Sequence, residues 1–187
     1  MDTLNRLAPG VPILAEERGG ARSGTRWAVD PLDGTTNFTR AMPVVGVSVA
    51  LVDAGRPVVG VVLAPWLGLE FAVERGRGAT LNGDRLPPLA PGDPRAAVVA
   101  TGFPFRVKER MDQYVPVLLG CLGRFEDLRR AELELGTWDV AAGAALVLEL
   151  GGRVTDWTGG DDWLDSGDIL AAPAAVHEVL LELAAAG

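Results

Sequence analysis

Two aspartates, Asp30 and Asp33, stand three residues apart at the end of an apolar run and directly before a turn. Pro31 fixes its own backbone φ and favours an extended Asp30, so we expect Asp30 to lie at the end of a strand. Gly34 permits a tight bend, and two threonines follow it as at the start of a helix. Such a segment puts two carboxylates beside unpaired backbone N–H groups, which could hold a cation and an anion side by side. This pattern indicates metal-assisted chemistry on a phosphate.

Two further acids could complete a cation site. Glu16 precedes the aspartate pair by one loop, and Asp139 stands at the start of a distant helical segment. Carboxylates about 4 Å apart repel by roughly 4 kcal/mol at an effective dielectric near 20, so a cluster of all four would need a cation. Mg²⁺ is the expected cation, since it binds a few carboxylates together with water and phosphate oxygens. The single His177 and the single Cys121 argue against a zinc site.

Each of these residues also has a simpler interpretation. Taken alone, Asp139 would be a helix N-cap, Glu16 would belong to a solvated loop, and Asp33 would be an ordinary turn residue. His177 is expected to be an exposed or partly packed residue of a C-terminal helix, and Cys121 a small buried apolar group. Only the combination of acids favours a site over these alternatives.

The composition excludes several classes of protein. Hydrophobic residues at 48% and charged residues at 22% of 187 residues are typical of a globular chain. No apolar run approaches the roughly 20 residues of a membrane helix. Seventeen basic against 25 acidic residues give a net charge of −8 without a basic stripe, so we expect neither nucleic acid nor a membrane as partner. A single cysteine and the lack of a signal-peptide pattern favour the cytoplasm.

The first half of the chain predicts a sheet. Residues 2–8 have the pattern of a helix end, and residues 11–14 form a short apolar run that leads to Glu16. Three runs rich in β-branched residues and separated by turns predict an antiparallel meander: 44–53, 56–64 and 69–74. A proline-rich connector over 87–94 then marks a change of region.

The second half alternates strands and helices. Short apolar runs predict strands at 97–100, 153–155 and 168–172, and helical spacing predicts helices over 107–119 and 174–186. The strongest helix opens at Asp139, continues over 140–150 and ends at Gly151. We therefore expect one domain over 1–187, with subregions of roughly 1–90 and 91–187.

Two long motifs, in the same order along the chain, resemble a known family. The segment Trp27-Ala-Val-Asp-Pro-Leu-Asp-Gly-Thr-Thr-Asn-Phe38 resembles the metal-binding signature of the inositol monophosphatase family. The segment from Trp138-Asp-Val-Ala-Ala-Gly143 through Glu149-Leu-Gly-Gly152 resembles its second signature. Supporting matches extend the resemblance over nearly the whole chain: 13–17, 78–83 and 101–104. The implied fold is an α/β protein, a layered α/β sandwich of the inositol monophosphatase and fructose-1,6-bisphosphatase type. Its active site is expected between two sheets.

The resemblance implies a role for individual residues. The metal ligands would be Glu16, Asp30, the Leu32 carbonyl, Asp33 and Asp139. The residues acting in catalysis would be Thr35, which orients the attacking water, with Asp33 and Glu16. Substrate would contact Asp33, the Gly34 and Thr35 amides, Glu132 and Asp139. The implied activity is Mg²⁺-dependent hydrolysis of a small phosphorylated sugar or polyol, such as inositol monophosphate, by in-line attack of an activated water.

Two segments of the family have no match in this chain. One is a helix pair with an aspartate segment, which in the family precedes the Glu16 region and supplies the partner of Thr35. The other is a helix and strand expected after Ala131, where Glu132 follows at once. We therefore expect a truncated version of the fold, and the lost packing favours a homodimer.

The alternatives that remain open are of two kinds. One is a weakly active or inactive member that binds a metal or a protein partner. The other is a related phosphatase for a sugar bisphosphate, histidinol phosphate or phosphoadenosine phosphate.

Overall fold

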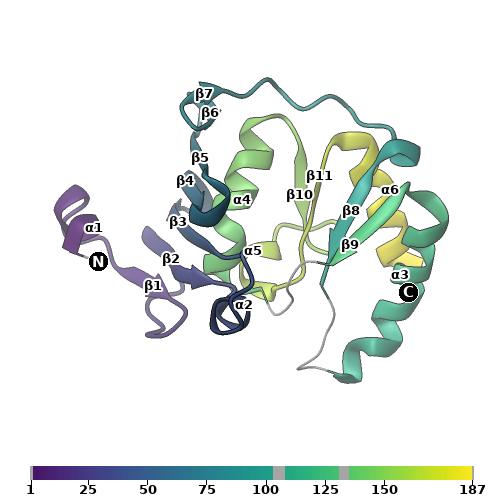
Figure 1. Ribbon diagram of the computed structural model, residues 1–187, viewed down its shortest axis with the longest axis horizontal. Helices are drawn as coiled ribbons and strands as arrows, with labels where there is room; N and C mark the ends of the chain where they lie inside the picture. Colours follow the sequence, from purple (N-terminus) through teal and green to yellow (C-terminus); the bar gives the residue numbers. More distant parts are fainter. Residues whose placement is uncertain (1, 103–107, 131–134, 187) are drawn as a thin grey trace. The chain divides into compact units, whose positions relative to one another are not determined.

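The computed structural model describes residues 2–102, 108–130 and 135–186, and it divides into two compact units (Figure 1). The first unit comprises residues 1–88 and 136–150, and the second comprises 89–135 and 151–187. The chain therefore leaves the first unit after Pro88 and returns to it for one helix, a return that the expected division into 1–90 and 91–187 did not include. That the two units form a single domain stays a prediction.

A seven-stranded sheet forms the body of the first unit, with its strands in sequence order. The strands are β1 (Ile13–Ala15), β2 (Arg26–Asp33), β3 (Gly46–Asp53), β4 (Arg56–Ala64), β5 (Leu69–Glu74), β6 (Gly78–Leu81) and β7 (Asp84–Arg85). β1 runs parallel to β2, and the remaining neighbours are antiparallel. The meander expected over 44–74 is confirmed as β3 to β5, because β-branched residues pack well on a pleated surface.

Helix α4 (Thr137–Glu149) lies against this sheet, and contacts β2 to β6. Its buried face consists largely of alanines, which allow a close approach. A Cβ placed on Gly60 of β4 would lie 3.0 Å from the Ala142 Cα and carbonyl oxygen, so glycine is required where β4 and α4 meet. The remaining helices of this unit are short: α1 (Asp2–Leu7), α2 (Thr35–Thr39) and the 3₁₀ turn η1 (Pro65–Leu67).

The described residues of the second unit form two pairs of strands and two longer helices. β8 (Val98–Thr101) and β9 (Asp127–Arg130) are parallel, and β10 (Arg153–Thr155) and β11 (Leu170–Ala172) are antiparallel. The helical elements are η2 (Pro94–Ala96), η3 (Lys108–Arg110), α3 (Met111–Arg124), α5 (Trp163–Ser166) and α6 (Ala174–Ala186). Its core joins side chains of α3, β11 and α6. The strands expected at 97–100, 153–155 and 168–172 and the helix at 174–186 are confirmed with small shifts, while β9 was not expected.

Two single residues were assigned an environment from sequence. Cys121 is buried as expected, and burial raises the pKa of its thiol. His177 is only 2% exposed, so the expectation of an exposed or partly packed histidine is wrong. Its Nε2 lies 3.0 Å from the Thr155 hydroxyl, and burial lowers the pKa of the imidazole. In the described residues, no helix combines the length and the apolar character that a membrane crossing needs.

Candidate metal centre

Strand β2 does not end at Asp30, as the sequence predicted, but continues to Asp33. Its register with β3 pairs Asp30 with Ser48 and Asp33 with Gly46, so β2 carries one more residue than its partner over this stretch. The extra residue forms a bulge next to Pro31, which has no N–H to donate to β3. In an unbroken strand Asp30 and Asp33, three residues apart, would point to opposite faces of the sheet. The bulge bends the strand end and so changes the directions of the two side chains.

The turn after β2 is held by its own polar groups. The Leu32 amide donates to Asp30 Oδ1 over 2.8 Å, and the Thr35 hydroxyl donates to the Leu32 carbonyl over 3.1 Å. Gly34 adopts the left-handed conformation, with φ of 82° and ψ of 39°, and precedes the first residue of α2. A Cβ at this position would lie 2.9 Å from the Val44 carbonyl oxygen, so both conformation and space require glycine.

Asp139 comes from the first turn of α4. It is not the N-cap, which is Gly136, but the third helical residue, and the Gly136 N–H donates to its Oδ2 over 2.6 Å. This bond is the backward half of a capping box and fixes the carboxylate at the helix start. Ser48 of β3 donates its hydroxyl to the Trp138 carbonyl over 2.7 Å. The start of α4 is therefore tied to the strand that pairs with β2.

The three aspartates Asp30, Asp33 and Asp139 lie together. Each offers a carboxylate oxygen, and these oxygens all lie within 4.8 Å of one another. Asp30 is buried, Asp139 is partly buried and Asp33 is exposed. Burial, the hydrogen bond with Asp30 and the charges of Asp30 and Asp33 together raise the pKa of Asp139 to about 7, against the lowering effect of the Gly136 N–H. The raised pKa of Asp139 shows that the cluster lacks a balancing positive charge. Three carboxylate oxygens in such a cluster fit a hard divalent cation, which would supply that charge.

The other residues expected at the site lie differently. Glu16 is exposed, in the turn after β1, and is not one of the three clustered acids. Ala15 pairs with Val29 in the parallel ladder, so Glu16 lies at the same strand end as Asp30. Glu132 lies outside the described residues. The Leu32 carbonyl lies near the end of β2, where it accepts a hydrogen bond from the Thr35 hydroxyl.

Two residues of the centre were not identified from sequence, Ser48 and Gly136. Ser48 is 5% exposed and is the one polar residue of the stretch 46–52. A polar residue at a core-facing position is the signal that could have singled it out. Gly136 left no comparable signal, because an N-cap glycine looks like any loop glycine.

Comparison with known proteins identifies relatives of this chain. A model described as the inositol monophosphatase family matches residues 1–121 and 127–186. Nus factor SuhB of Escherichia coli (strain K12) is 36% identical over 203 aligned residues, which cover 97% of this chain and 76% of the relative. The crystal structure of extragenic suppressor protein suhB from Bartonella henselae has a TM-score of 0.89 at 32% identity, over 100% of this chain and 80% of that one. Inositol monophosphatase from Anabaena has a TM-score of 0.88 at 29% identity, over 97% and 81%.

Proposed function

The chain belongs to the inositol monophosphatase family, and on that premise we propose that it hydrolyses a small phosphate monoester with Mg²⁺ held at the aspartate cluster. The observation that carries this proposal is the convergence of Asp30, Asp33 and Asp139 within 4.8 Å. The first two belong to β2 and the third to α4, more than 100 residues later. Like charges brought together at such a cost in repulsion support a role in binding a cation.

In the proposed centre the three aspartates would hold Mg²⁺, and Glu16 and the Leu32 carbonyl would be further ligands. Oxygen donors of this kind suit Mg²⁺ better than a transition metal. A bound cation would supply positive charge that lowers the pKa of a water and offsets the charge of the phosphoryl oxygens. The buried Asp30 would fix the position of the centre, while Asp33 is exposed and so accessible to a substrate.

Thr35 is the proposed residue for orienting the attacking water. Its hydroxyl proton is donated to the Leu32 carbonyl, so the oxygen keeps lone pairs that can accept a proton from water. The amides of Gly34 and Thr35 are the proposed phosphate contacts, beside the cation. The phosphate would then lie in line between the oriented water and the leaving alkoxide. No covalent phosphoenzyme is required.

The proposed substrate is a phosphorylated sugar or polyol such as inositol monophosphate, with Glu132 as a further contact to substrate hydroxyls. The relative from Anabaena, named an inositol monophosphatase, supports this choice over a sugar bisphosphate, histidinol phosphate or phosphoadenosine phosphate. The net charge of −8 supports a small substrate rather than nucleic acid, and a cytoplasmic site of action stays part of the proposal.

A homodimer is also part of the proposal. Phe38 and Trp66 stack with ring centroids 6.0 Å apart and an interplanar angle of 12°, and each is 50% exposed. Met42, Val44 and Leu67, from the neighbouring segments of chain, are also exposed. Exposed apolar side chains in such number support a protein–protein contact at this surface.

A second candidate function is binding without turnover. The relative from Escherichia coli is named a Nus factor rather than a phosphatase, and this name favours a member that acts through a partner. Such a protein would keep the metal centre as a structural element. Its phosphatase activity would be weak or absent.

One experiment separates the two candidates. Purified protein is incubated with a panel of phosphate monoesters that includes inositol monophosphate, with Mg²⁺ or with EDTA, and Mg²⁺ binding is measured by calorimetry. Phosphate release that requires Mg²⁺ supports the enzyme, and Mg²⁺ binding without release supports the second candidate. Absence of both Mg²⁺ binding and release would contradict the proposed metal centre itself.

A further inference from the structure

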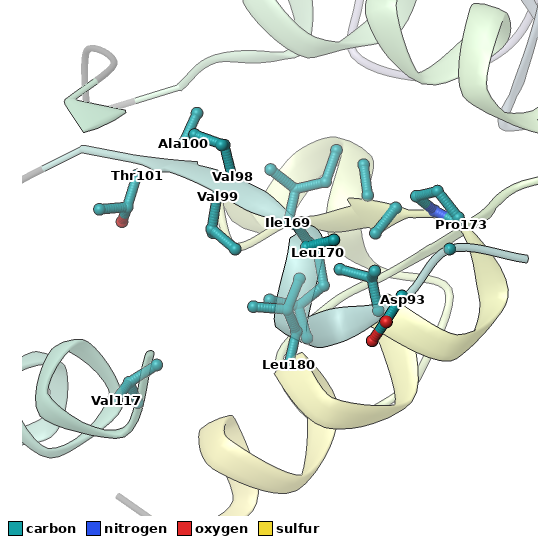
Figure 2. Close-up of a pocket in the computed structure, with 16 residues that line it drawn as sticks. Asp93, Val98, Val99, Ala100, Thr101, Val117, Ile169, Leu170, Pro173 and Leu180 are labelled. Carbon is teal, nitrogen blue, oxygen red and sulfur yellow. The ribbon is translucent and has the colours of Figure 1, made fainter. Parts of the chain in front are cut away.

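The second unit contains a cavity of about 550 Å³ that belongs to no part of the proposed metal centre. Residues 98–101 of β8 line one side of it, and residues 169–173, which include β11, line another (Figure 2). Val117 of α3 and Val176 and Leu180 of α6 also line it, and all three belong to the apolar core of this unit. A cavity of this size is large enough for a ligand, and β8 and β11 supply seven of the sixteen residues that line it.

The two strands that line the cavity, β8 and β11, are both edge strands of their sheets. Within the described residues β8 pairs with β9 alone, and β11 pairs with β10 alone. Each therefore has a second edge without a strand partner. An unpaired strand edge presents a row of backbone N–H and C=O groups that can accept another strand.

The hydrogen bonds around β9 show which residues of β8 face the cavity. Leu128, the partner of Val99, donates its N–H to the Asp127 carboxylate, and its carbonyl accepts from the Arg129 side chain. These bonds to its own strand's side chains indicate that the backbone groups of Leu128 point away from β8. In a parallel pair the bonds toward β9 must then come from Val99 and from residues two positions away. The Ala97 carbonyl, two residues before Val99, accepts from the amide of Glu126, which precedes the regular strand β9, so the β8 side of this pair has the expected direction.

It follows that Val98 and Ala100 direct their backbone N–H and C=O groups to the cavity, because successive residues of a strand point to opposite sides. Their side chains are exposed, whereas the Val99 side chain packs against the apolar core. β11 alternates in the same way, with Leu170 and Ala172 buried and Ala171 exposed. A strand lying between β8 and β11 would therefore place alternate side chains on an apolar floor and in solvent.

The charge of the lining adds one more requirement for an occupant. Of the lining residues in the described part of the chain, Asp93 alone is charged. Figure 2 shows Asp93 near Pro173 and Thr101 toward the opposite side, so the carboxylate lies by the start of β8. An extended peptide with a basic residue at that end would complement it.

We infer that this cavity is a docking site for an extended segment of a partner protein, which adds a strand between β8 and β11. The segment has alternating apolar and polar residues and a lysine or arginine at the end that meets Asp93. Both edges of the segment would find backbone donors and acceptors, a match that only a polypeptide strand provides. The inference concerns the second unit and does not depend on the proposed phosphatase activity.

The test uses the full chain and the synthetic peptide acetyl-Lys-Thr-Val-Thr-Val-Thr-Lys-amide, with hydrogen exchange of individual amides followed by NMR. In the free protein the amides of Val98 and Ala100 should exchange faster than that of Val99, which bonds to β9. Saturating peptide should slow exchange at Ala100 by about tenfold or more, as expected for an amide that enters a strand ladder. Failure of the peptide to bind, or binding that leaves Ala100 unchanged, would overturn the inference.

Three variants of the protein and one altered peptide show how the peptide is held. Ala100→Pro removes an N–H that faces away from β9, so the fold should remain intact by circular dichroism while peptide affinity falls about fivefold. The matched variant Ala100→Ser keeps the N–H and should keep the affinity.

Asp93→Asn retains an acceptor for the Arg95 amide but should weaken binding about twofold to fivefold and reduce its salt dependence. Replacement of both peptide lysines by glutamine should remove the difference between Asp93 and its variant. Equal affinity of Ala100→Pro and Ala100→Ser would contradict the proposed strand addition.

Discussion

At Asp139, the stability of the metal-free fold and the proposed cation-binding role oppose each other. Its carboxylate is partly buried and lies beside Asp30 and Asp33, and the result is a pKa of about 7. A carboxyl group with no role in binding a cation would be more stable as an amide at this position. The residue therefore offers a way to test the metal centre through stability alone, independently of any substrate.

Asp139→Asn should stabilise the metal-free protein by about 1 kcal/mol, because it removes like-charge repulsion and keeps an acceptor for the Gly136 N–H. The same variant should lose the rise in melting temperature that Mg²⁺ causes in the wild type. Thermal unfolding with EDTA and with Mg²⁺ measures both effects. Asp84→Asn, a change on the exposed β7, is the matched control and should alter neither. A variant that melts lower without metal and still responds to Mg²⁺ would argue against a cation site at Asp139.

Asp156 shows the opposite case, a carboxylate whose charge the fold stabilises. It accepts hydrogen bonds from the Thr158 hydroxyl and from the amides of Thr158, Gly160 and Asp162, which lower its pKa to about 2. A lowered pKa contributes stability that is complete above the ordinary value near 4 and is lost as pH falls toward 2.

The free energy of unfolding should therefore decrease between pH 4 and pH 2 in the wild type. In Asp156→Asn this part of the decrease should be absent, since asparagine does not titrate, and the variant should be less stable at pH 7. Urea unfolding at a series of pH values measures the slope. An identical slope in wild type and variant would show that the charge on Asp156 is not what the loop stabilises.

At the scale of elements, the position of α4 on the sheet decides whether the three aspartates meet. The contact of Gly60 with Ala142 sets the distance between β4 and α4, and α4 carries Asp139. Gly60→Ala should push the helix away, lower stability by about 1–3 kcal/mol and reduce Mg²⁺ affinity, although the residue binds no metal.

Gly143→Ala is the matched control on the same helix. A Cβ at Gly143 meets nothing within 4 Å, so this variant should gain about 0.5–1 kcal/mol through helix propensity and keep its Mg²⁺ affinity. Chemical denaturation and calorimetry measure stability and affinity in both variants. The account of α4 would fail if Gly60→Ala bound Mg²⁺ as tightly as Gly143→Ala does.

Elements with a strong periodic pattern could be predicted from the sequence, and those fixed by tertiary contacts could not. The meander of β3 to β5 and the helix α6 follow from patterning alone. The bulge in β2 could not be foreseen, because Pro31 is as compatible with a strand end as with an edge irregularity. β9 contains Asp-Leu-Arg-Arg, a sequence of weak strand propensity, and pairing with β8 determines it.

The same distinction applies to the candidate site. Asp30, Asp33 and Asp139 could be predicted because each lies within a long sequence motif, and the structure brings these three together. Whether Glu16 joins them as a ligand stays a prediction. The burial of His177 depends on β10, from which Thr155 reaches the imidazole, and no local pattern around His177 indicates that contact.

At the scale of the whole molecule, the proposed metal centre and the docking cavity belong to different units. All three clustered aspartates lie in the first unit, and every residue that lines the cavity lies in the second. The alignment with the Escherichia coli relative spans 203 positions, more than the 187 residues of this chain, so that relative has residues in the matched region without a counterpart here. Family membership therefore coexists with a difference in internal length.

Mg²⁺ should protect one unit selectively. Hydrogen exchange measured by mass spectrometry should slow over 26–33 and 137–149 when Mg²⁺ is added, because binding stabilises the elements that hold its ligands. At a Mg²⁺ concentration of 100 times Kd, binding should raise the free energy of unfolding by about 2.7 kcal/mol. Residues 153–155 and 170–172 should exchange as before. Equal slowing of exchange in all four segments would contradict a cation site held by β2 and α4.

We propose that the aspartate cluster holds the cation used in phosphate ester hydrolysis, and the decisive measurement is the rate of phosphate release in saturating Mg²⁺. Wild type, Asp33→Asn and the control Asp84→Asn are compared on the best substrate of the monoester panel. Removal of a residue that hydrogen-bonds to a metal ligand commonly lowers metal affinity or activity by about 10-fold to 100-fold. Removal of a ligand itself should therefore lower kcat/KM by about 100-fold or more. The account predicts that loss for Asp33→Asn alone, with Asp84→Asn equal to wild type. Undiminished Mg²⁺-dependent release by Asp33→Asn would contradict it.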